Sequence, residues 1–188
     1  MFNLKKKPRT ESEQGTEEKK HRKSWFFLGV IVAIALLRLL VFRPIWVSNV
    51  GMSETINAHD YLIVNRLEKV ERFDVIAFKV ADTSTKKSEY IGRVIGKAGD
   101  SLQYKDNQLL INGKKYSESY LAKNQVTEDF KLGETMLDKK IPKNCYFVLG
   151  DNRNRADDSR YFGYVKKSQV EGVIKLRLYP FNRISYFK

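Results

Sequence analysis

The pattern of apolar and polar residues divides the chain into three parts. Residues 1–24 are polar, charged and without periodicity, which predicts a disordered tail. Residues 25–43 form an apolar segment in which Arg38 is the only charge before its last residue. Residues 44–188 alternate short apolar runs with turn residues, a pattern typical of strands and turns.

The apolar segment is long enough to cross a bilayer as a helix. Pro44 is expected to end that helix, because the residue before a proline is pushed out of the α region. Trp25 and Trp46 would then lie about 32 Å apart at helical rise, close to the hydrocarbon thickness, and tryptophan prefers the membrane interface. The apolar core is longer than that of a cleaved signal peptide, and no small-x-small site follows it. We therefore expect a single-pass anchor with a cytoplasmic N-terminus and an extracytoplasmic domain after it.

Short runs rich in β-branched and aromatic residues predict strands. They are Tyr61–Val64, Val75–Phe78, Tyr90–Ile95 and Val173–Leu178. Residues 101–116 predict a meander, since the turn dipeptides Asp106-Asn107 and Asn112-Gly113 flank an apolar run. Residues 117–140 are polar and without a clear period, which indicates an irregular lobe. The predicted fold is a mainly β, antiparallel domain behind one N-terminal transmembrane helix.

The charge and the cysteine and histidine content limit which ligands and partners are expected. The net charge is +13, but it is spread along the chain, and the apolar segment makes anionic lipid a simpler partner for the basic tail than nucleic acid. The single cysteine, Cys145, excludes an internal disulfide, and its apolar neighbours predict a buried core thiol. Two histidines and one cysteine predict no metal site and no cofactor.

Four segments carry a recognisable series of motifs. They are Val47–Ile56, Arg72–Phe78, Tyr90–Asp100 and Gly150–Arg160. In this order, behind an apolar anchor, they resemble bacterial type I signal peptidase of the short Gram-positive kind, over most of residues 25–181. The resemblance implies a signal-peptidase-I-like β domain. It also implies a serine endopeptidase that removes signal peptides at the outer face of the cytoplasmic membrane with a serine nucleophile and a lysine base.

The catalytic positions of that family are occupied by small residues here. The family pattern Ser-Met-x-Pro-Thr, aligned on Met52, places the nucleophile at Gly51. The pattern Lys-Arg-Val-Ile-Gly, aligned on Arg93, places the general base at Gly92. An accessory serine that hydrogen-bonds the lysine corresponds to Ala156. By this resemblance no catalytic residue is expected.

The residues around those positions match the family better. In the family, the arginine after the base pairs with the aspartate of the last motif, which here are Arg93 and Asp151, and a second pair corresponds to Asp158 and Arg160. Glu54 stands where the family has proline. The binding or structural residues expected to remain are Met52, Arg93, Asp151, Asn152, Arg153, Asp158, Ser159 and Arg160.

Other side chains are poorly placed to replace the missing ones. In an extended chain Ser53 would be displaced by about 6.6 Å from the nucleophile position, and Ser48 would point to the opposite face. Lys97 is five residues from Gly92, so in a continuing strand its side chain would point to the face opposite the base position. His59 is predicted to be a solvated turn residue. Because nucleophile and base must lie within hydrogen-bond reach, normal turnover is not expected.

Three functions follow as hypotheses. The first is a proteolytically inactive protein that binds exported precursors or pilins as a chaperone or assembly factor, since dyad-less relatives occur in pilus clusters. The second is an active signal peptidase with a relocated nucleophile. The third is a membrane-anchored structural domain. The predicted partners are the cytoplasmic membrane and exported preproteins or pilins; the sequence predicts no particular oligomeric state.

Overall fold

The computed structural model describes residues 25–36, 38, 40–48, 50–81, 87–134, 136 and 138–187. The chain splits into two compact units, residues 1–41 and 42–188. In the first unit the described residues are helical, whereas the predicted disordered tail lies outside the described residues. Within the described part of the chain, no helix combines the length and the apolar character needed to cross a membrane. The second unit is called the β unit below.

The β unit begins earlier than the apolar pattern predicts. Strand β1, Phe42–Trp46, pairs antiparallel with β2, Tyr61–Asn65. The prediction that Trp46 lies one helical span from Trp25 is therefore wrong, because Trp46 pairs with Tyr61 in a sheet. Pro44 explains the change, since proline cannot continue a helix but is tolerated in an edge strand such as β1.

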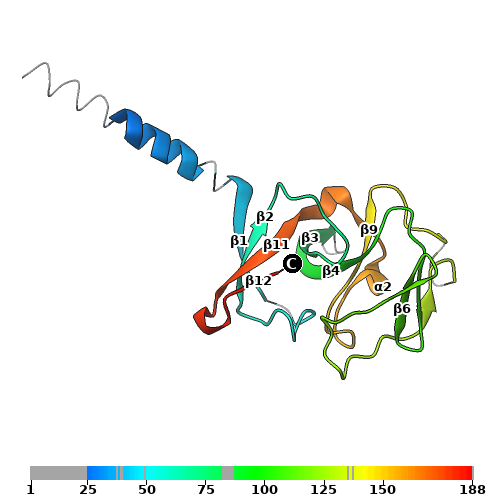
Figure 1. Cartoon of the computed structure of the whole chain (residues 1–188). Helices are drawn as coiled ribbons and strands as arrows, with labels where there is room; N and C mark the ends of the chain where they lie inside the picture. The colour runs from blue at the N-terminus through cyan, green and yellow to red at the C-terminus, as the bar shows by residue number, and fades with distance from the viewer. Residues whose placement is uncertain are drawn as a thin grey trace, which may run out of the picture. The chain divides into compact units, whose positions relative to one another are not determined.

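The main sheet has eight strands, which run in the order β1-β2-β11-β3-β4-β9-β10, with β12 paired to β11 (Figure 1). The other strands of this sheet are β3 (Val75–Ala81), β4 (Lys87–Lys97), β9 (Cys145–Leu149), β10 (Val165–Lys166), β11 (Val170–Tyr179) and β12 (Ser185–Tyr186). All pairings are antiparallel. The four strands predicted from apolar runs are confirmed as β2, β3, β4 and β11.

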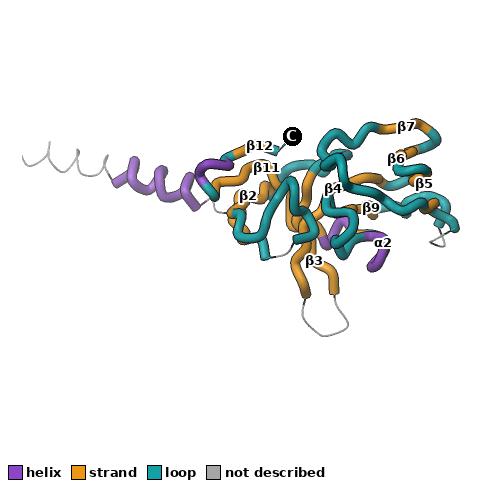
Figure 2. The backbone as a smooth tube through the Cα atoms, turned by 90° about the horizontal axis from the view of Figure 1, so that it is seen from below, coloured by secondary structure: helices purple, strands orange, loops and turns teal. Residues whose placement is uncertain are grey.

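A second sheet carries the predicted meander, and its strands lie together at one end of the β unit in Figure 2. Its strands are β5 (Leu102–Lys105), β6 (Gln108–Ile111), β7 (Lys114–Tyr116) and β8 (Phe130–Lys131), in the order β7-β6-β5-β8. Asp106 and Asn107 have φ of 50° and 58°, and Asn112 and Gly113 have 52° and 77°. Two-residue hairpin turns of type I′ need positive φ at both central residues, so both turn predictions are confirmed.

The remaining elements are short: α2 (Ser159–Phe162) and the 3-10 turns η1 (Lys167–Gln169) and η2 (Phe181–Arg183). Buried apolar side chains hold the sheets together, and among them Met52 and Ile56 anchor the loop between β1 and β2 with no exposed surface. Cys145 is only half-buried at the start of β9, which corrects the prediction of a core thiol. It lies opposite Lys166 of β10 and packs against the outside of a core cluster, where burial is incomplete.

Candidate functional site

The three positions that carry catalytic groups in signal peptidases come together around Gly150. A β-carbon placed on Gly150 would collide with the carbonyl oxygen of Gly51 and with the β-carbon of Ala156. Gly92 precedes Arg93, which pairs with Leu149. A β-carbon on Gly92 would lie 3.3 Å from the Leu149 carbonyl oxygen. The structure therefore gathers the positions that the motifs single out.

Beside these positions is a cavity of about 230 Å³. It is lined by Ser48, Val50, Gly51, Tyr90, Ile91, Arg155, Ala156 and Asp157. Ser48 supplies the one serine hydroxyl in this lining, and neither lysine nor histidine is among these residues. Within the described part of the chain, the Ser48 hydroxyl has no recorded hydrogen bond to a titratable side chain. The cavity offers room for a small side chain, with no lysine to activate a nucleophile.

The loop that bears Gly51 is fixed to the last motif by several contacts, among them the following three. The Asn152 amide donates to the Gly51 carbonyl at 3.1 Å, and the Asp151 amide lies 3.3 Å from the Met52 sulfur. The Thr55 hydroxyl donates to the Asp151 carboxylate at 2.5 Å. These contacts hold the cavity wall in place without any contribution from a side chain at position 51.

The ion pair expected between Arg93 and Asp151 is confirmed. The guanidinium donates twice to the buried carboxylate, at 2.9 and 2.6 Å. It also donates to the Phe73 carbonyl at 2.9 Å and lies over the Tyr120 ring, 4.0 Å from its centroid. A bidentate pair fixes both groups in orientation, so β4 and the loop after β9 are locked together.

The second expected pair, Asp158 with Arg160, is also confirmed at 2.8 Å. Asp158 caps α2 and accepts the Gly150 amide at 3.1 Å, while the buried Ser159 hydroxyl accepts the Val148 amide at 2.9 Å. The serine and the aspartate thus satisfy backbone amides at the end of β9. Their role in the structure is to set the backbone that packs against Gly51.

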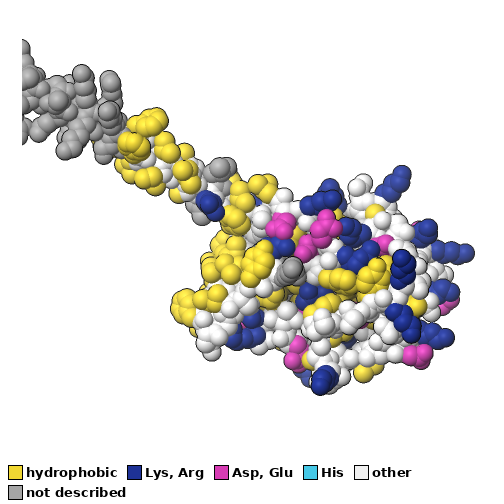
Figure 3. Space-filling model, in the orientation of Figure 1, with side chains coloured by type: hydrophobic (Ala, Val, Ile, Leu, Met, Phe, Trp, Pro, Cys, Tyr) yellow, Lys and Arg dark blue, Asp and Glu magenta, His cyan; other side chains and the backbone are white. Residues whose placement is uncertain are grey.

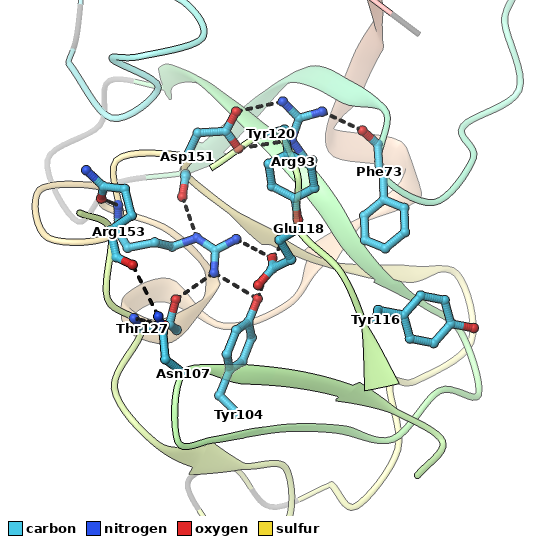
Figure 4. A network of polar contacts seen from close by, with 12 residues as sticks. Phe73, Arg93, Tyr104, Asn107, Tyr116, Glu118, Tyr120, Thr127, Asp151 and Arg153 are labelled. Atoms are coloured by element: carbon cyan, nitrogen blue, oxygen red, sulfur yellow. Dashed lines mark hydrogen bonds and ion pairs between the residues drawn. The ribbon is translucent and has the colours of Figure 1, made fainter. Parts of the chain in front are cut away.

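Arg153 is the most completely bonded cation of the site (Figure 4). Its side chain donates to the Gly150 carbonyl at 3.0 Å, the Tyr104 hydroxyl at 2.8 Å, the Thr127 hydroxyl at 2.7 Å and the Glu118 carboxylate at 2.6 Å. A buried guanidinium needs such partners, because an unpaired buried charge is strongly destabilising. The network ties the second sheet and the irregular lobe to the cavity wall.

The tyrosines of this network stay protonated. Tyr104 and Tyr120 both donate to the Glu118 carboxylate, at 2.7 and 2.6 Å. Burial raises the pKa of both phenols well above the ordinary range. The sequence did not single out Glu118, because it lies in a segment without periodicity. The signal that could have found it is that a buried arginine such as Arg153 needs a carboxylate partner.

Two of the alternative catalytic side chains are engaged elsewhere. The Ser53 hydroxyl donates to the Val50 carbonyl and accepts a hydrogen bond from the Asn152 side-chain Nδ2 at 2.9 Å, and Ser53 does not line the cavity. The Lys97 ammonium pairs with Glu71 at 2.7 Å and lines a different cavity.

Ser48 lies where the sequence argument did not place it. It lines the same cavity as Gly51, so the prediction of an opposite face is wrong. The reason is local: the backbone leaves the strand at Trp46 and turns over residues 50–56, so strand parity does not apply. His59 lies in a turn with φ of 69°, as expected.

Glu54 has a backbone conformation that excludes the residue found there in the family. Its φ is 94°, whereas proline is fixed near −65°. A proline at position 54 could not adopt the φ that Glu54 has here.

Arg177 fixes the far end of the same loop and was not predicted as a site residue. It donates to the Thr55 carbonyl at 2.8 Å, to Asp60 at 3.0 Å and to the Arg183 carbonyl at 2.7 Å. The apolar run of β11 indicated only a core strand, so the sequence did not single out Arg177. Among the described residues, no group of His, Cys, Asp and Glu side chains is arranged to hold a metal ion.

Comparison with known proteins decides the family. Residues 20–179 match the model of the signal peptidase family, peptidase S26. The chain belongs to this family. Signal peptidase I of Bacillus caldolyticus is 36% identical over 181 residues, covering 90% of this chain and 97% of the relative. Signal peptidase I V of Bacillus subtilis is 36% identical over 166 residues, covering 81% and 96%.

Among solved structures, the crystal structure of a signal peptidase I from Enterococcus faecalis V583 is 43% identical. The match covers 56% of this chain and 97% of that chain, with a TM-score of 0.49.

Proposed function

We propose that this signal peptidase family protein binds extended segments of exported proteins without cleaving them. The observation that carries the proposal is the cavity beside Gly51. Its walls and supporting ion pairs are present, while the positions of nucleophile, base and accessory hydroxyl hold Gly51, Gly92 and Ala156. Losing these groups removes proton transfer and attack on a carbonyl, but leaves the space and the backbone around it.

Strand β4 offers the peptide-binding edge. Along one side it pairs with β3 from Lys87 to Arg93, and along the other it pairs with β9 only from Arg93 onward. Among the described strands, the stretch 88–91 thus has one unpaired side, and Tyr90 and Ile91 at its end line the cavity. An extended peptide can add to such an edge through backbone hydrogen bonds and place alternate side chains in adjacent hollows.

The surroundings of Gly92 support the absence of a base. A β-carbon there would lie 2.5 Å from the Val148 Cγ1 atom and 3.5 Å from Phe78. A lysine at this position would require the packed Val148 side chain to move. The local packing is therefore adapted to glycine.

We place the protein at the cytoplasmic membrane, with the β unit on the outer side. The apolar run from residue 25 supports an anchor. An aromatic series on β1, β2, the end of β11 and η2 supports contact of the β unit with the bilayer surface. Its rings are those of Trp46, Tyr61, Tyr179 and Phe181, with centroids 5.0 to 6.0 Å apart, and all of these side chains except the half-buried Tyr61 are exposed. In Figure 3 hydrophobic side chains gather over this edge.

The clients we propose are precursors of exported proteins, pilins among them. Family members with the name signal peptidase I act on such precursors, and a retained cavity without catalytic groups suits a chaperone or assembly factor.

Calorimetry tests this function. The full-length protein in detergent is titrated with a peptide that spans the cleavage region of an exported precursor, and saturable binding is expected. Ser48→Trp should fill the cavity and weaken binding by about tenfold or more, since the indole would occupy the space that the peptide side chain needs. Ser117→Trp, the same change at an exposed position outside the cavity, is the control. Equal binding by both variants would show that the peptide does not use this cavity, and no saturable binding by the unchanged protein would favour a purely structural domain.

An active peptidase is the second candidate, and two observations favour it. The relatives carry the name signal peptidase I, and Ser48 lines the cavity. On this view the Ser48 hydroxyl is a relocated nucleophile. Cleavage of a preprotein that is lost in Ser48→Ala but kept in Ser53→Ala would establish it.

A further inference from the structure

Two adjoining cavities lie away from the Gly51 cavity and share no residue with it. Their volumes are about 560 and 530 Å³, and both are lined by Asn144, Cys145 and Lys167. Together they form a hollow, called the basic groove below, between the loop after β2, the end of β4, the start of β9 and the turn η1. Its charged lining residues are Arg66, Glu68, Lys69, Lys97, Lys143, Lys166 and Lys167.

The positive charge of the basic groove is only partly balanced. Glu68 is bound to Lys175 at 2.8 Å, outside the groove's lining, and Glu71 balances Lys97 at 2.7 Å. Among the described residues, no carboxylate lies within 4.0 Å of the ammonium groups of Lys143, Lys166 or Lys167, and all three residues are exposed. Clustered like charges around a concave surface focus the potential and attract an anionic partner.

The floor of the basic groove is less polar than its rim. Val70, Cys145 and Tyr146, which are buried or half-buried, contribute to the lining. An inorganic anion or a polyphosphate would leave these apolar groups unused. We propose that the basic groove binds an acidic polypeptide segment, whose carboxylates meet the rim lysines while an apolar side chain packs on the floor.

The location of the basic groove argues against a lipid headgroup. Val170 at the start of β11 lines it, whereas Tyr179 at the other end of the strand belongs to the exposed aromatic series. Ten residues of strand span about 30 Å. A β unit that rests on the bilayer through its aromatic side chains would hold the basic groove well clear of the headgroups, where it meets proteins outside the membrane.

Cys145 provides a direct reporter, because it is the only cysteine of the chain, is half-buried and lines both cavities. The experiment measures the rate at which a maleimide alkylates Cys145 in the full-length protein in detergent. A twelve-residue peptide of glutamates with two phenylalanines is expected to slow alkylation by about fivefold or more at saturation. The same peptide with glutamine in place of glutamate should give less than about twofold protection, because the rim attraction is electrostatic.

Charge reversal supplies the matched controls. Lys143→Glu, Lys166→Glu and Lys167→Glu combined should weaken binding of the acidic peptide, measured by fluorescence anisotropy, by about tenfold or more. Lys105→Glu, Lys114→Glu and Lys115→Glu combined make the same change in net charge at exposed positions of β5 and β7 and should leave the affinity for the peptide within about twofold. If both triple variants lost a similar amount of affinity for the acidic peptide, the effect of charge would not be local and the proposed site would be wrong.

Other ligands separate the alternatives. Protection of Cys145 by polyphosphate and not by the peptide would replace the proposal with a phosphate-binding groove. Protection by vesicles that contain phosphatidylglycerol would replace it with a lipid contact. If none of these ligands protects Cys145, the proposal is wrong. None of these results depends on the Gly51 cavity, so failure here is distinct from failure of the proposed function.

Discussion

Gly92 and Val148 are packed so closely that a β-carbon at position 92 would lie 2.5 Å from the Val148 Cγ1 atom. Real β-carbons do not approach a neighbour to this distance, so one of the two residues must move when any side chain is introduced. A side chain at position 92, which the motif register matches to the family's base, would therefore need Val148 to move.

This relationship predicts a coupling between the two positions. Gly92→Ala should lower the free energy of unfolding of the β unit by about 1–3 kcal/mol, the usual cost of overpacking. Val148→Ala should also destabilise the protein, but Gly92→Ala should cost about 1 kcal/mol or less in its background, because the clash is gone. Urea unfolding of the four proteins of this cycle measures the coupling. Purely additive losses would show that Val148 does not obstruct a side chain at position 92.

The loop conformation at Glu54 gives a second prediction. A non-glycine residue at φ of 94° is strained, so Glu54→Gly should raise the free energy of unfolding by about 1 kcal/mol. Glu54→Pro should lower it by about 2 kcal/mol or more, since proline cannot adopt this φ. Glu54→Ala keeps the strain and serves as the control. Stabilisation by proline would mean that the loop takes the family's conformation.

Buried phenols predict a loss of stability in alkali. Burial raises the pKa of Tyr104 and Tyr120 above the ordinary value of 10.0, so the folded chain keeps both protons where the unfolded chain loses them. Stability is then complete below about pH 10 and falls as pH rises through that value, by up to about 1.4 kcal/mol per pH unit for each tyrosine.

The control for this pH effect is the double variant that combines Tyr104→Phe and Tyr120→Phe. Unfolding free energies between about pH 9 and 11.5 should fall less steeply in this variant than in the unchanged protein. Parallel curves for the two proteins would show that the phenols are not buried as the structure has them.

Contact between the aromatic series and the bilayer gives a fourth prediction. In a Trp25→Phe variant, Trp46 is the only tryptophan, and it is 63% exposed in the β unit. After reconstitution, brominated lipid should quench its fluorescence strongly, since an interfacial indole lies at the level of the headgroups. Fluorescence equal to that in unbrominated lipid would contradict the contact.

Local patterns in the sequence were sufficient for much of the fold. The turns at Asp106-Asn107 and Asn112-Gly113 were predictable because few residue pairs accept positive φ twice in succession. The strands around Ile63 and Ile76 were predictable because their short runs are rich in β-branched and aromatic residues. Strand β1 was not predictable, because its apolar residues continue the apolar run of the preceding helix. Only the pairing with β2 distinguishes the strand from that helix.

The site was predictable to the extent that motifs fix positions along the chain. Gly51, Gly92 and Ala156 were located by register with Met52 and Arg93, and the pairing of Arg93 with Asp151 followed from the same resemblance. The partners of Arg153 were not, because Glu118 and Thr127 come from a segment without periodicity. The position of Ser48 was missed because a strand rule was applied to a turn.

The most direct test of the central claim is a cleavage assay. The full-length protein in detergent is incubated with an exported preprotein, and release of the mature form is followed by gel electrophoresis, with an active signal peptidase I as positive control. The account predicts no release above the protein-free rate, together with saturable binding of the same preprotein. Release that is abolished by Ser48→Ala would contradict it.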